Sequence, residues 1–309
     1  MDHARLAELA QALGDAAQLN APLASYSRAG IGGPADLLVV ARDPATLASA
    51  VCLAREADVP WRIFGGLTNI LLPDSGLRGV VILNQATAAN FDAATHRVRA
   101  ASGAVMIKLA REAVRRGWGG LTWAVGLPGT LGGAVVNNAG AFGGEIAGTL
   151  VAAEVLGPES ETREVDASWF DFRYRCSKLK GAGDAWVVLA ATLQLRPGTP
   201  SHLAAKAAEY TERRQRTQPP GRTLGSTFKN PPDDYAGRLI EAAGLKGHQI
   251  GGIKVSEQHA NFLINTNPEG GAAANYRALI RVVQTQVQQQ FDVWLEPEIE
   301  MLPEESRRF

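Results

Sequence analysis

The pattern of apolar and polar positions in the first third of the chain predicts alternating helices and strands. A helix is expected over Ala4–Gln18, where leucines recur at helical spacing. Short apolar runs typical of strands stand at Leu37–Ala41, Trp61–Phe64, Val80–Leu83 and Arg97–Ala101. Further helices are predicted from the Asp43-Pro44 cap to Ala57 and over Met106–Arg116. This alternation is typical of an α/β fold.

The same pattern continues in the rest of the chain. Strands are predicted over Leu150–Leu156, Trp186–Leu195, Gly251–Val255, Asn261–Asn265 and Leu295–Leu302. Helices are predicted over Ala204–Arg214, Tyr235–Ala243 and a last long segment from Tyr276 to Phe291. Between the two groups, Pro197-Gly198-Thr199-Pro200 is a linker signal and the expected domain boundary.

One stretch, Val125–Glu145, fits neither pattern. It holds seven glycines between Gly126 and Gly144, so we expect tightly turning backbone and not a helix interior. Exposed N–H groups in such turns form concave anion sites that suit a pyrophosphate. A second glycine loop, Gly65–Asn69, follows a predicted strand, where a phosphate could also bind. A core loop that packs two layers and binds nothing is an equally good interpretation.

Composition narrows the choice of function classes. The 309 residues exceed the usual size of one hydrophobic core, so two or three domains are expected. The net charge is zero, which gives no electrostatic footprint for nucleic acid or a membrane surface. The two cysteines and five histidines show no metal-ligand spacing, and no metal is expected. Charged residues near the start and the lack of a long apolar run favour a cytoplasmic protein.

Two nucleotide-binding motifs are not supported. Gly221–Thr227 lacks the lysine and the spacing of a Walker A loop, and no G-x-G-x-x-G opens a helix after a strand.

Three other positions could carry chemistry. Ser226 follows Gly225 beside Lys229, Arg175 lies in a basic segment, and Glu296, Glu298 and Glu300 alternate as on one face of a strand. The residues alone favour simpler interpretations for all three, namely a serine turn, a solvated basic face and crowded surface carboxylates.

Taken together, motifs in a fixed order resemble the UDP-N-acetylenolpyruvoylglucosamine reductase family, also called UDP-N-acetylmuramate dehydrogenase. The resemblance runs from about Leu23 to Leu302. Its motifs are Ile31–Asp36, Gly65–Leu72, Gly120–Gly129, Gly132–Ala134, Asn137–Gly143, Phe172–Arg175, Gly225–Pro231, Ala236–Glu241, Ser256–Phe262 and Leu295–Glu298. The chain lacks an insertion found in one subgroup and is similar to the shorter, second type.

The resemblance implies a p-cresol-methylhydroxylase-type FAD-binding fold of two α/β subdomains with a C-terminal α/β substrate domain. The expected limits are an N-terminal helix in 1–22, an FAD-binding domain in 23–197 (subdomains about 23–85 and 86–197) and a substrate domain in 198–309. FAD is expected to bind non-covalently. Its expected contacts are Gly65, Gly66, Leu67, Thr68, Asn69, Ala124, Gly126, Thr130, Gly132, Gly133, Asn137, Gly140, Ala141 and Gly143.

The family reaction reduces UDP-N-acetylglucosamine enolpyruvate with NADPH in two half-reactions that use one cleft. The resemblance implies that Arg175 stabilises the substrate's carboxylate, that Ser226 donates a proton, and that Glu298 hydrogen-bonds the developing enediolate. The expected substrate-binding residues are Tyr174, Lys229, Asn230, His259 and Asn261. The resemblance gives no partner besides the two substrates, and we expect a monomer.

The chain departs from the family pattern in a few places. Leu67 and Thr68 stand in a loop that is usually glycine- and serine-rich, and a leucine adopts glycine-only backbone angles at a cost. We therefore expect Leu67 to alter the path of this loop and FAD affinity. Thr223-Leu224 precedes Gly225 where Ser-Ala is common, and Asp292 stands where glycine is often found. No catalytic residue type is lost.

Two alternatives stay open. One is another FAD oxidase or dehydrogenase of the same fold, against which the Gly225–Pro231 and Leu295–Glu298 motifs argue. The other is a flavin-binding or nucleotide-sugar-binding protein without turnover, which the altered Gly65–Asn69 loop favours.

Overall fold

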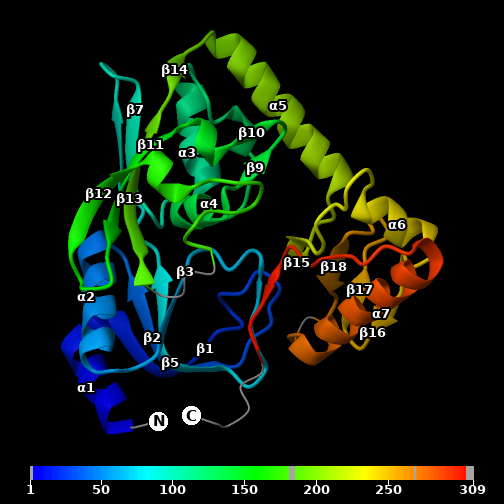
Figure 1. The fold of residues 1–309 in the computed structure, drawn as a ribbon, viewed down its shortest axis with the longest axis horizontal. Coiled ribbons are helices and arrows are strands. Elements are labelled where there is room, and N and C mark those ends of the chain that lie inside the picture. Colours follow the sequence, from blue (N-terminus) through cyan, green and yellow to red (C-terminus); the bar gives the residue numbers. More distant parts are fainter. Residues whose placement is uncertain (1–2, 181–184, 268, 304–309) are drawn as a thin grey trace.

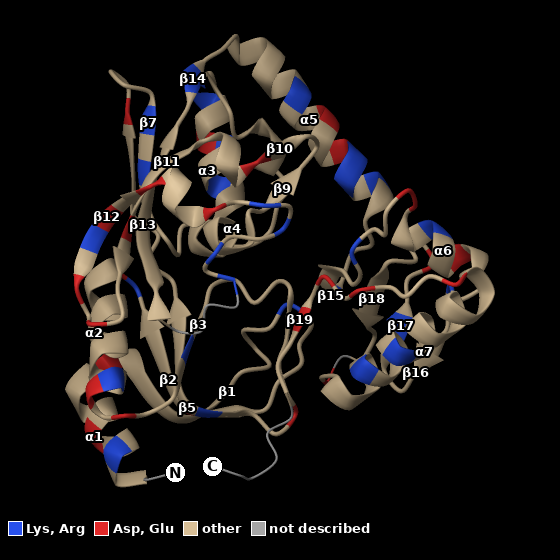
Figure 2. Ribbon diagram, viewed as in Figure 1, with Lys and Arg blue, Asp and Glu red and all other residues tan. Residues whose placement is uncertain are grey.

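The computed structural model describes residues 3–180, 185–267 and 269–303. Figure 1 shows two sheets with their helices on one side of the molecule and a smaller C-terminal group of elements on the other, with α5 (Pro200–Thr217) leading from one to the other. Figure 2 shows acidic and basic residues interspersed along the ribbon, as expected for zero net charge. No helix in the described ranges is both long and apolar enough to cross a membrane.

The first sheet is built from the N-terminal part of the chain. Its strand order is β1 (Ala17–Pro22), β2 (Pro34–Ala41), β5 (Leu77–Asn84) and β3 (Trp61–Phe64). Strands β2, β5 and β3 are parallel, while β1 runs antiparallel to β2. Two helices, α1 (His3–Leu13) and α2 (Pro44–Glu56), share a buried core with this sheet. Asp43 caps α2 by accepting a hydrogen bond from the Thr46 N–H at 2.8 Å, as the sequence predicts.

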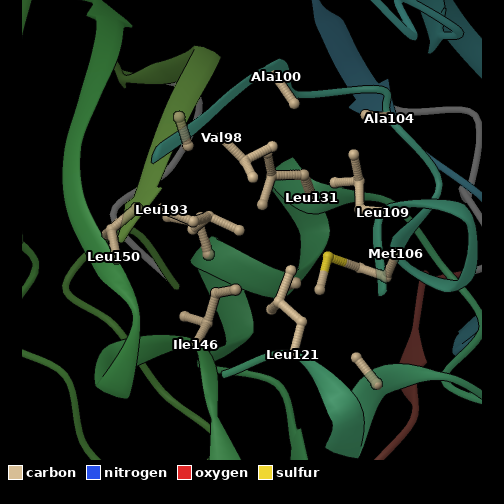
Figure 3. Packing of buried hydrophobic residues seen from close by; sticks show 14 of the residues in the cluster. Val98, Ala100, Ala104, Met106, Leu109, Leu121, Leu131, Ile146, Leu150 and Leu193 are labelled. Atoms are coloured by element: carbon tan, nitrogen blue, oxygen red, sulfur yellow. The ribbon is translucent and has the colours of Figure 1, made fainter. Parts of the chain in front are cut away.

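The second sheet is antiparallel and supports the glycine-rich stretch. Its strand order is β12 (Thr162–Asp166), β11 (Leu150–Leu156), β13 (Val187–Gln194), β7 (Arg97–Ala101) and β6 (Ala89–Asp92). Helices α3 (Met106–Arg115) and α4 (Leu131–Asn137), the second of which lies within the stretch, share a buried apolar core with this sheet (Figure 3). Two short pairs flank this layer, β8 (Trp118–Gly119) with β14 (Arg196–Pro197) and β9 (Gly140–Ala141) with β10 (Gly144–Glu145).

The C-terminal part forms a third sheet with its own core. Its order is β15 (Arg222–Ser226), β18 (Phe262–Asn265), β17 (Ile253–Val255) and β16 (Gln249–Ile250). Helices α6 (Ala236–Ala242) and α7 (Ala273–Phe291) share a buried core with this sheet, in which Tyr276 is fully buried. The chain then returns to the N-terminal part, where β19 (Glu300–Met301) pairs in parallel with β4 (Ile70–Leu71). This return brings Leu295–Glu298 past the end of β15.

The mixed α/β class is confirmed, but two predicted elements are wrong in extent. The first helix ends at Leu13 and not at Gln18, because Gly14 takes a φ of +55° and β1 begins at Ala17. The expected strand over Leu295–Leu302 is reduced to Glu300–Met301. The three glutamates therefore do not share one strand face, since Glu296 is exposed while Glu298 is half-buried.

The Val125–Glu145 stretch also differs from its prediction, because it contains α4, a helix of seven residues. Two glycines stand inside this helix despite their cost to helix stability. A Cβ on Gly132 would lie 2.9 Å from the Ser102 Cβ, so close packing against the second sheet requires glycine there. The expected domain limits stay predictions, and 1–22 and 198–309 reach beyond the described residues.

Candidate active site

Arg175 lies at the tip of a tight turn. The backbones of Arg173 and Cys176 exchange both hydrogen bonds, at 2.9 and 3.0 Å, and Arg175 takes a φ of +54° between them. The Lys180 ammonium donates to the Arg175 carbonyl at 3.0 Å. A Cβ on Gly140 would lie 3.3 Å from an Arg175 guanidinium nitrogen. The guanidinium therefore rests against the glycine-rich stretch, at a place where the lack of a side chain gives it room.

The partner of Arg175 is Glu298. Its carboxylate oxygen lies 3.3 Å from the Arg175 Nε, and both side chains are about three-quarters buried. Burial raises the pKa of the Glu298 carboxyl, and the charges of Arg175, Lys180 and Lys229 offset part of that rise. The Arg175 Nε is buried and makes no hydrogen bond within the described residues, so the contact is electrostatic. The Arg175 cation thus lies next to a carboxyl group, that of Glu298, whose pKa is raised.

Ser226 ends β15 beside these two groups. Gly225 takes a φ of +85°, and the register of β15 against β18 shifts between Thr223 and Ser226. Such a bulge redirects the side chain that follows it. The next residue ties the serine to Glu298, because the Glu298 N–H donates to the Thr227 carbonyl at 2.8 Å. The structure therefore brings Ser226, Arg175 and Glu298 together from three distant parts of the sequence.

The predicted substrate residues divide by exposure. Tyr174 is 66% exposed next to Arg175, whose guanidinium carbon lies 5.2 Å from the Tyr174 ring centroid. Lys229 is partly exposed and pairs with Glu296. Asn230 is exposed, and its side-chain oxygen accepts a hydrogen bond from the Ala236 N–H at 3.1 Å, at the start of α6. In sequence, Tyr174 precedes Arg175, while Lys229 and Asn230 follow Ser226 closely.

The other two predicted substrate residues are engaged within the protein. The His259 Nδ1 accepts a hydrogen bond from the Asn261 N–H at 3.2 Å, and burial lowers the pKa of the imidazole. Asn261 is 4% exposed, and its carboxamide bonds the backbone of Phe228. Both polar groups of the Asn261 carboxamide and the Nδ1 of His259 are therefore engaged within the protein.

The two glycine loops predicted to bind a cofactor lie against each other. A Cβ on Gly65 would overlap the Thr130 hydroxyl, and one on Gly129 would lie 3.4 Å from the Thr68 hydroxyl. Leu67 takes a φ of +46° with its side chain buried, so it does adopt left-handed backbone angles. This left-handed backbone is the expected source of strain, and burial of the side chain in the core beside Leu72 compensates for it. The expected effects on the path of the loop and on FAD affinity stay predictions.

The first loop presents backbone donors. Across the residues that the structure describes, the N–H groups of Gly66, Leu67 and Thr68 donate no hydrogen bond to the protein. Consecutive free N–H groups beside a left-handed residue form an anion-binding concavity. Asn69 continues the loop, and its carbonyl accepts from the Glu300 N–H at 2.9 Å. The Gly65–Asn69 loop therefore suits a phosphate.

The start of α4 differs, because its donors are already used. The Leu131 and Gly132 N–H groups donate to the carbonyls of Ala104 and Ser102, and the Gly133 N–H donates to the Thr130 hydroxyl at 3.4 Å. The Asn137 amide donates to the Gly133 carbonyl at 3.0 Å. These predicted cofactor residues thus shape and support the second loop.

The remaining predicted cofactor residues extend along the same stretch. Ala124 is buried, and a Cβ on Gly126 would lie 2.5 Å from the Arg214 side chain of α5. Gly140 and Ala141 form β9, and Gly143 takes a φ of +78° with open space at its Cβ position. Between them, the Phe142 ring stacks on Tyr210 of α5 with 4.2 Å between centroids. The stretch is thereby fastened to α5.

Comparison with known proteins identifies the family. Residues 34–166 match the model of an FAD binding domain, and residues 215–302 match the model of the C-terminal domain of UDP-N-acetylenolpyruvoylglucosamine reductase. The UDP-N-acetylenolpyruvoylglucosamine reductase of Nostoc punctiforme is 42% identical over 285 residues, which cover 91% of this chain and 85% of that protein. This chain belongs to the UDP-N-acetylenolpyruvoylglucosamine reductase family.

Other relatives agree over nearly the full length. The reductase of Rubrobacter xylanophilus is 40% identical over 294 residues, covering 95% of this chain and 98% of that protein. The crystal structure of the reductase from Thermus caldophilus superposes with a TM-score of 0.78 at 31% identity, covering 93% of this chain. The expected p-cresol-methylhydroxylase-type FAD-binding fold with an added C-terminal domain is thereby confirmed.

The residues present fit the FAD of this reductase family. The free N–H groups of Gly66, Leu67 and Thr68 are donors for its diphosphate. Arg28 lies beside this loop, since its N–H donates to the Leu67 carbonyl at 3.3 Å, and Arg214 packs against Gly126 of the second loop. Burial and the nearby Arg28 charge both lower the pKa of Arg214. Within the described residues, no ion pair is formed by Arg214. An anionic ligand would therefore be stabilised there.

Sequence reasoning missed some residues of the reductase site. Lys180 supports Arg175 and faces Glu298, yet its sequence signal was only one more cation in a basic segment. Thr227 links Ser226 to Glu298 through its backbone carbonyl, a role that no side-chain pattern could reveal. Gly129 contacts Thr68 at a φ of +113°, and the Pro128-Gly129 turn was its available signal.

Proposed function

We propose that this chain catalyses the NADPH-dependent reduction of UDP-N-acetylglucosamine enolpyruvate to UDP-N-acetylmuramate, a step of peptidoglycan precursor synthesis. Membership of the reductase family and the match to an FAD binding domain support the reaction class. The observation that carries the assignment is the contact of Arg175 with Glu298, beside the loop that carries Ser226. Bound FAD supplies hydride transfer from NADPH to the terminal carbon of the enolpyruvyl group.

Arg175 is proposed to bind the carboxylate of the enolpyruvyl group. Hydride addition at the terminal carbon moves negative charge onto that carboxylate, and a fixed guanidinium stabilises it. In the structure described here the same guanidinium faces the carboxyl of Glu298 at 3.3 Å. The substrate's carboxylate would thus share or replace a carboxyl partner that Arg175 already has.

Glu298 is proposed to act in its protonated form. Burial already raises its pKa, and a substrate carboxylate that draws on the charge of Arg175 would raise it further. A neutral carboxyl can donate a hydrogen bond to the enediolate, whereas a carboxylate would repel it.

Ser226 is proposed to protonate the carbon next to the carboxylate. A free hydroxyl is a weak acid, so proton donation depends on the basicity of the enediolate and on a fixed position. The bulge at Gly225 and the Thr227–Glu298 hydrogen bond provide that position.

Tyr174, Lys229 and Asn230 are proposed to bind the rest of the sugar nucleotide, since they flank the catalytic residues with exposed polar groups. The cytoplasm is the proposed location and a monomer the proposed state, in keeping with two water-soluble substrates. Sedimentation at assay concentration tests the monomer, and a concentration-dependent shift to a dimer would contradict it.

The proposed function is tested by following the flavin through both half-reactions. Purified protein reconstituted with FAD is reduced anaerobically with NADPH, and the enolpyruvyl sugar nucleotide is then added. Bleaching of the flavin's visible absorption followed by rapid return of colour is the expected result. Bleaching without recovery would favour another flavin dehydrogenase, and a chain that does not take up FAD would favour a protein without turnover.

A further inference from the structure

Asn261 is buried directly beneath the segment that carries the catalytic serine. Ser226 stands opposite Phe262 in the register of β15 and β18, and beyond it the chain runs on as Thr227–Lys229. Strand pairing between β15 and β18 ends at this point. Asn261 is only 4% exposed, although it comes from the loop just before β18.

The side chain of Asn261 replaces the missing strand partner. Its Oδ1 accepts a hydrogen bond from the Phe228 N–H at 2.9 Å, and its Nδ2 donates to the Phe228 carbonyl at 2.8 Å. Its own carbonyl accepts from the Thr227 N–H at 2.8 Å. The carboxamide alone thus holds two consecutive peptide units, which only a group with both a donor and an acceptor can do. With its backbone carbonyl, Asn261 holds three consecutive peptide units after Ser226.

The opposite side of the same segment binds the backbone of the run that carries Glu298. The Thr227 carbonyl accepts from the Glu298 N–H at 2.8 Å, and the Lys229 N–H donates to the Glu296 carbonyl at 2.9 Å. Phe228 forms a bridge with Pro297 between these two bonds. The Thr227–Lys229 segment is therefore fixed between Asn261 and the strand-like run that carries Glu298.

The turn before Asn261 is itself held in place. The Ser256 hydroxyl accepts hydrogen bonds from the N–H groups of Gln258 and His259, at 3.1 and 3.2 Å. The His259 Nδ1 then accepts from the Asn261 N–H, and a Cβ on Gly237 would lie 3.1 Å from the His259 ring. His259 is thus packed against α6 and orients Asn261 from behind.

We propose that Asn261 is a positioning residue for the catalytic serine and not a ligand of the substrate. Its carboxamide fixes the Ser226–Lys229 segment against the Glu296–Glu298 segment, and so sets the relation of the serine hydroxyl to the glutamate carboxyl. This proposal rests on the proposed function of the chain. A displacement of about 1 Å at a reacting group can slow a reaction about 100-fold, so a buried clamp of this kind affects rate.

The test compares Asn261→Ala with Asn265→Ala. Asn265 is the last residue of β18, is equally buried at 4%, and donates to the Ala29 carbonyl at 2.8 Å, away from Ser226. For both variants, flavin bleaching by NADPH and flavin recovery with the enolpyruvyl sugar nucleotide are timed separately. The melting temperature is measured beside them.

Asn261→Ala is expected to slow recovery about 10- to 100-fold and to increase its solvent deuterium isotope effect, while bleaching changes less than about twofold. Asn265→Ala is expected to lower the melting temperature comparably and to leave both rates near those of the wild type. Asn261→Ser, which retains one hydrogen-bonding group, supplies the same comparison if the alanine variant does not fold.

Two results would overturn the proposal. One is a folded Asn261 variant whose recovery rate at saturating substrate equals that of the wild type while substrate affinity falls, which is the behaviour of a ligand. The other is equal slowing of bleaching and recovery. Failure of the wild type itself to recover colour would instead contradict the proposed function.

Discussion

At the scale of single residues, the proposed chemistry depends on which charge Glu298 carries. Arg175 favours the carboxylate, while burial favours the neutral acid, and burial is the larger effect on its pKa. A substrate carboxylate at Arg175 weakens the effect of the Arg175 charge on the pKa of Glu298 and leaves the effect of burial unchanged. Substrate binding is therefore expected to be accompanied by proton uptake at Glu298.

This coupling predicts a pH dependence of substrate affinity. If the complex binds one more proton than the free protein, affinity falls as the pH rises through and above the pKa of Glu298 in the free protein, by at most about tenfold per pH unit. Titration of the oxidised protein with substrate between pH 5 and 9, followed by flavin difference spectra, measures this slope. In Glu298→Gln, which carries no ionisable proton there, the slope is expected to flatten. An unchanged slope in that variant would assign the proton to another group.

Leu67 gives a second prediction at this scale. Its left-handed backbone costs about 1–2 kcal/mol, while burial of its side chain contributes about 2–5 kcal/mol. Leu67→Gly is therefore expected to destabilise the protein by about 1–3 kcal/mol in urea unfolding, although it removes the strain. A more stable glycine variant would show that the strain outweighs the packing.

At the scale of elements, the regular periodic segments could be predicted from sequence and the exceptions could not. The cap at Asp43 and the apolar run Trp61–Phe64 gave α2 and β3 with their observed starts. The short helix α4 was hidden because Gly132 and Gly133 oppose helix formation. The contact with Ser102 explains Gly132, and no close contact explains Gly133. At Leu295–Leu302 the error is the opposite one, because a strand was predicted where most residues form none. Leu295 and Ile299 are buried there, as the apolar alternation indicates, but the segment has no continuous partner strand.

The candidate site shows the same division. Arg175, Ser226 and Glu298 were predicted from the motifs of the family resemblance, because a motif specifies the type of each side chain. Their proximity arises from backbone contacts such as Thr227 with Glu298, which have no sequence signal. The assignment of Asn261 as a ligand stays untested, and its carboxamide contacts with Phe228 favour a different role.

The contact between the two glycine loops predicts a large effect of a single methyl group. Gly65→Ala would push a Cβ into the Thr130 side chain, which also caps the start of α4. Overpacking of this kind costs about 1–3 kcal/mol and should separate the two loops. FAD retention after gel filtration is expected to fall along with the melting temperature of the apoprotein.

Gly148→Ala is the matched control for this substitution. Its Cβ position is open and its φ is not in the left-handed region, so both quantities are expected to stay near those of the wild type. Full FAD retention by Gly65→Ala would contradict the inferred role of the loop contact.

At the scale of the whole molecule, the C-terminal part is held to the N-terminal part by specific polar contacts. The Asp74 carboxylate accepts hydrogen bonds from the Ala273 and Ala274 N–H groups at 2.8 and 3.1 Å, and so caps α7 from outside its own region. Strand β19 pairs with β4 nearby. These contacts link the C-terminal part, which carries Ser226, to the first sheet region.

Asp74→Ala is therefore expected to cost about 0.5–2 kcal/mol and to loosen the C-terminal part in particular. Amide hydrogen exchange should accelerate in α7 and around β15, and recovery of the flavin with substrate should slow more than its bleaching. Asp43→Ala, which removes a comparable cap within the first sheet region, should lower stability by a similar amount without these effects. Equal exchange patterns in the two variants would contradict a role of Asp74 in holding the parts together.

The central claim is that one cleft oxidises NADPH and then reduces an enolpyruvyl sugar nucleotide, with Ser226 acting only in the second step. Anaerobic stopped-flow measurement of both half-reactions in Ser226→Ala tests it most directly. Bleaching by NADPH should proceed at the wild-type rate, while return of flavin colour with the substrate should slow by about 100- to 10,000-fold, the usual contribution of a positioned proton donor. Recovery at the wild-type rate, or equal slowing of both half-reactions, would contradict the account.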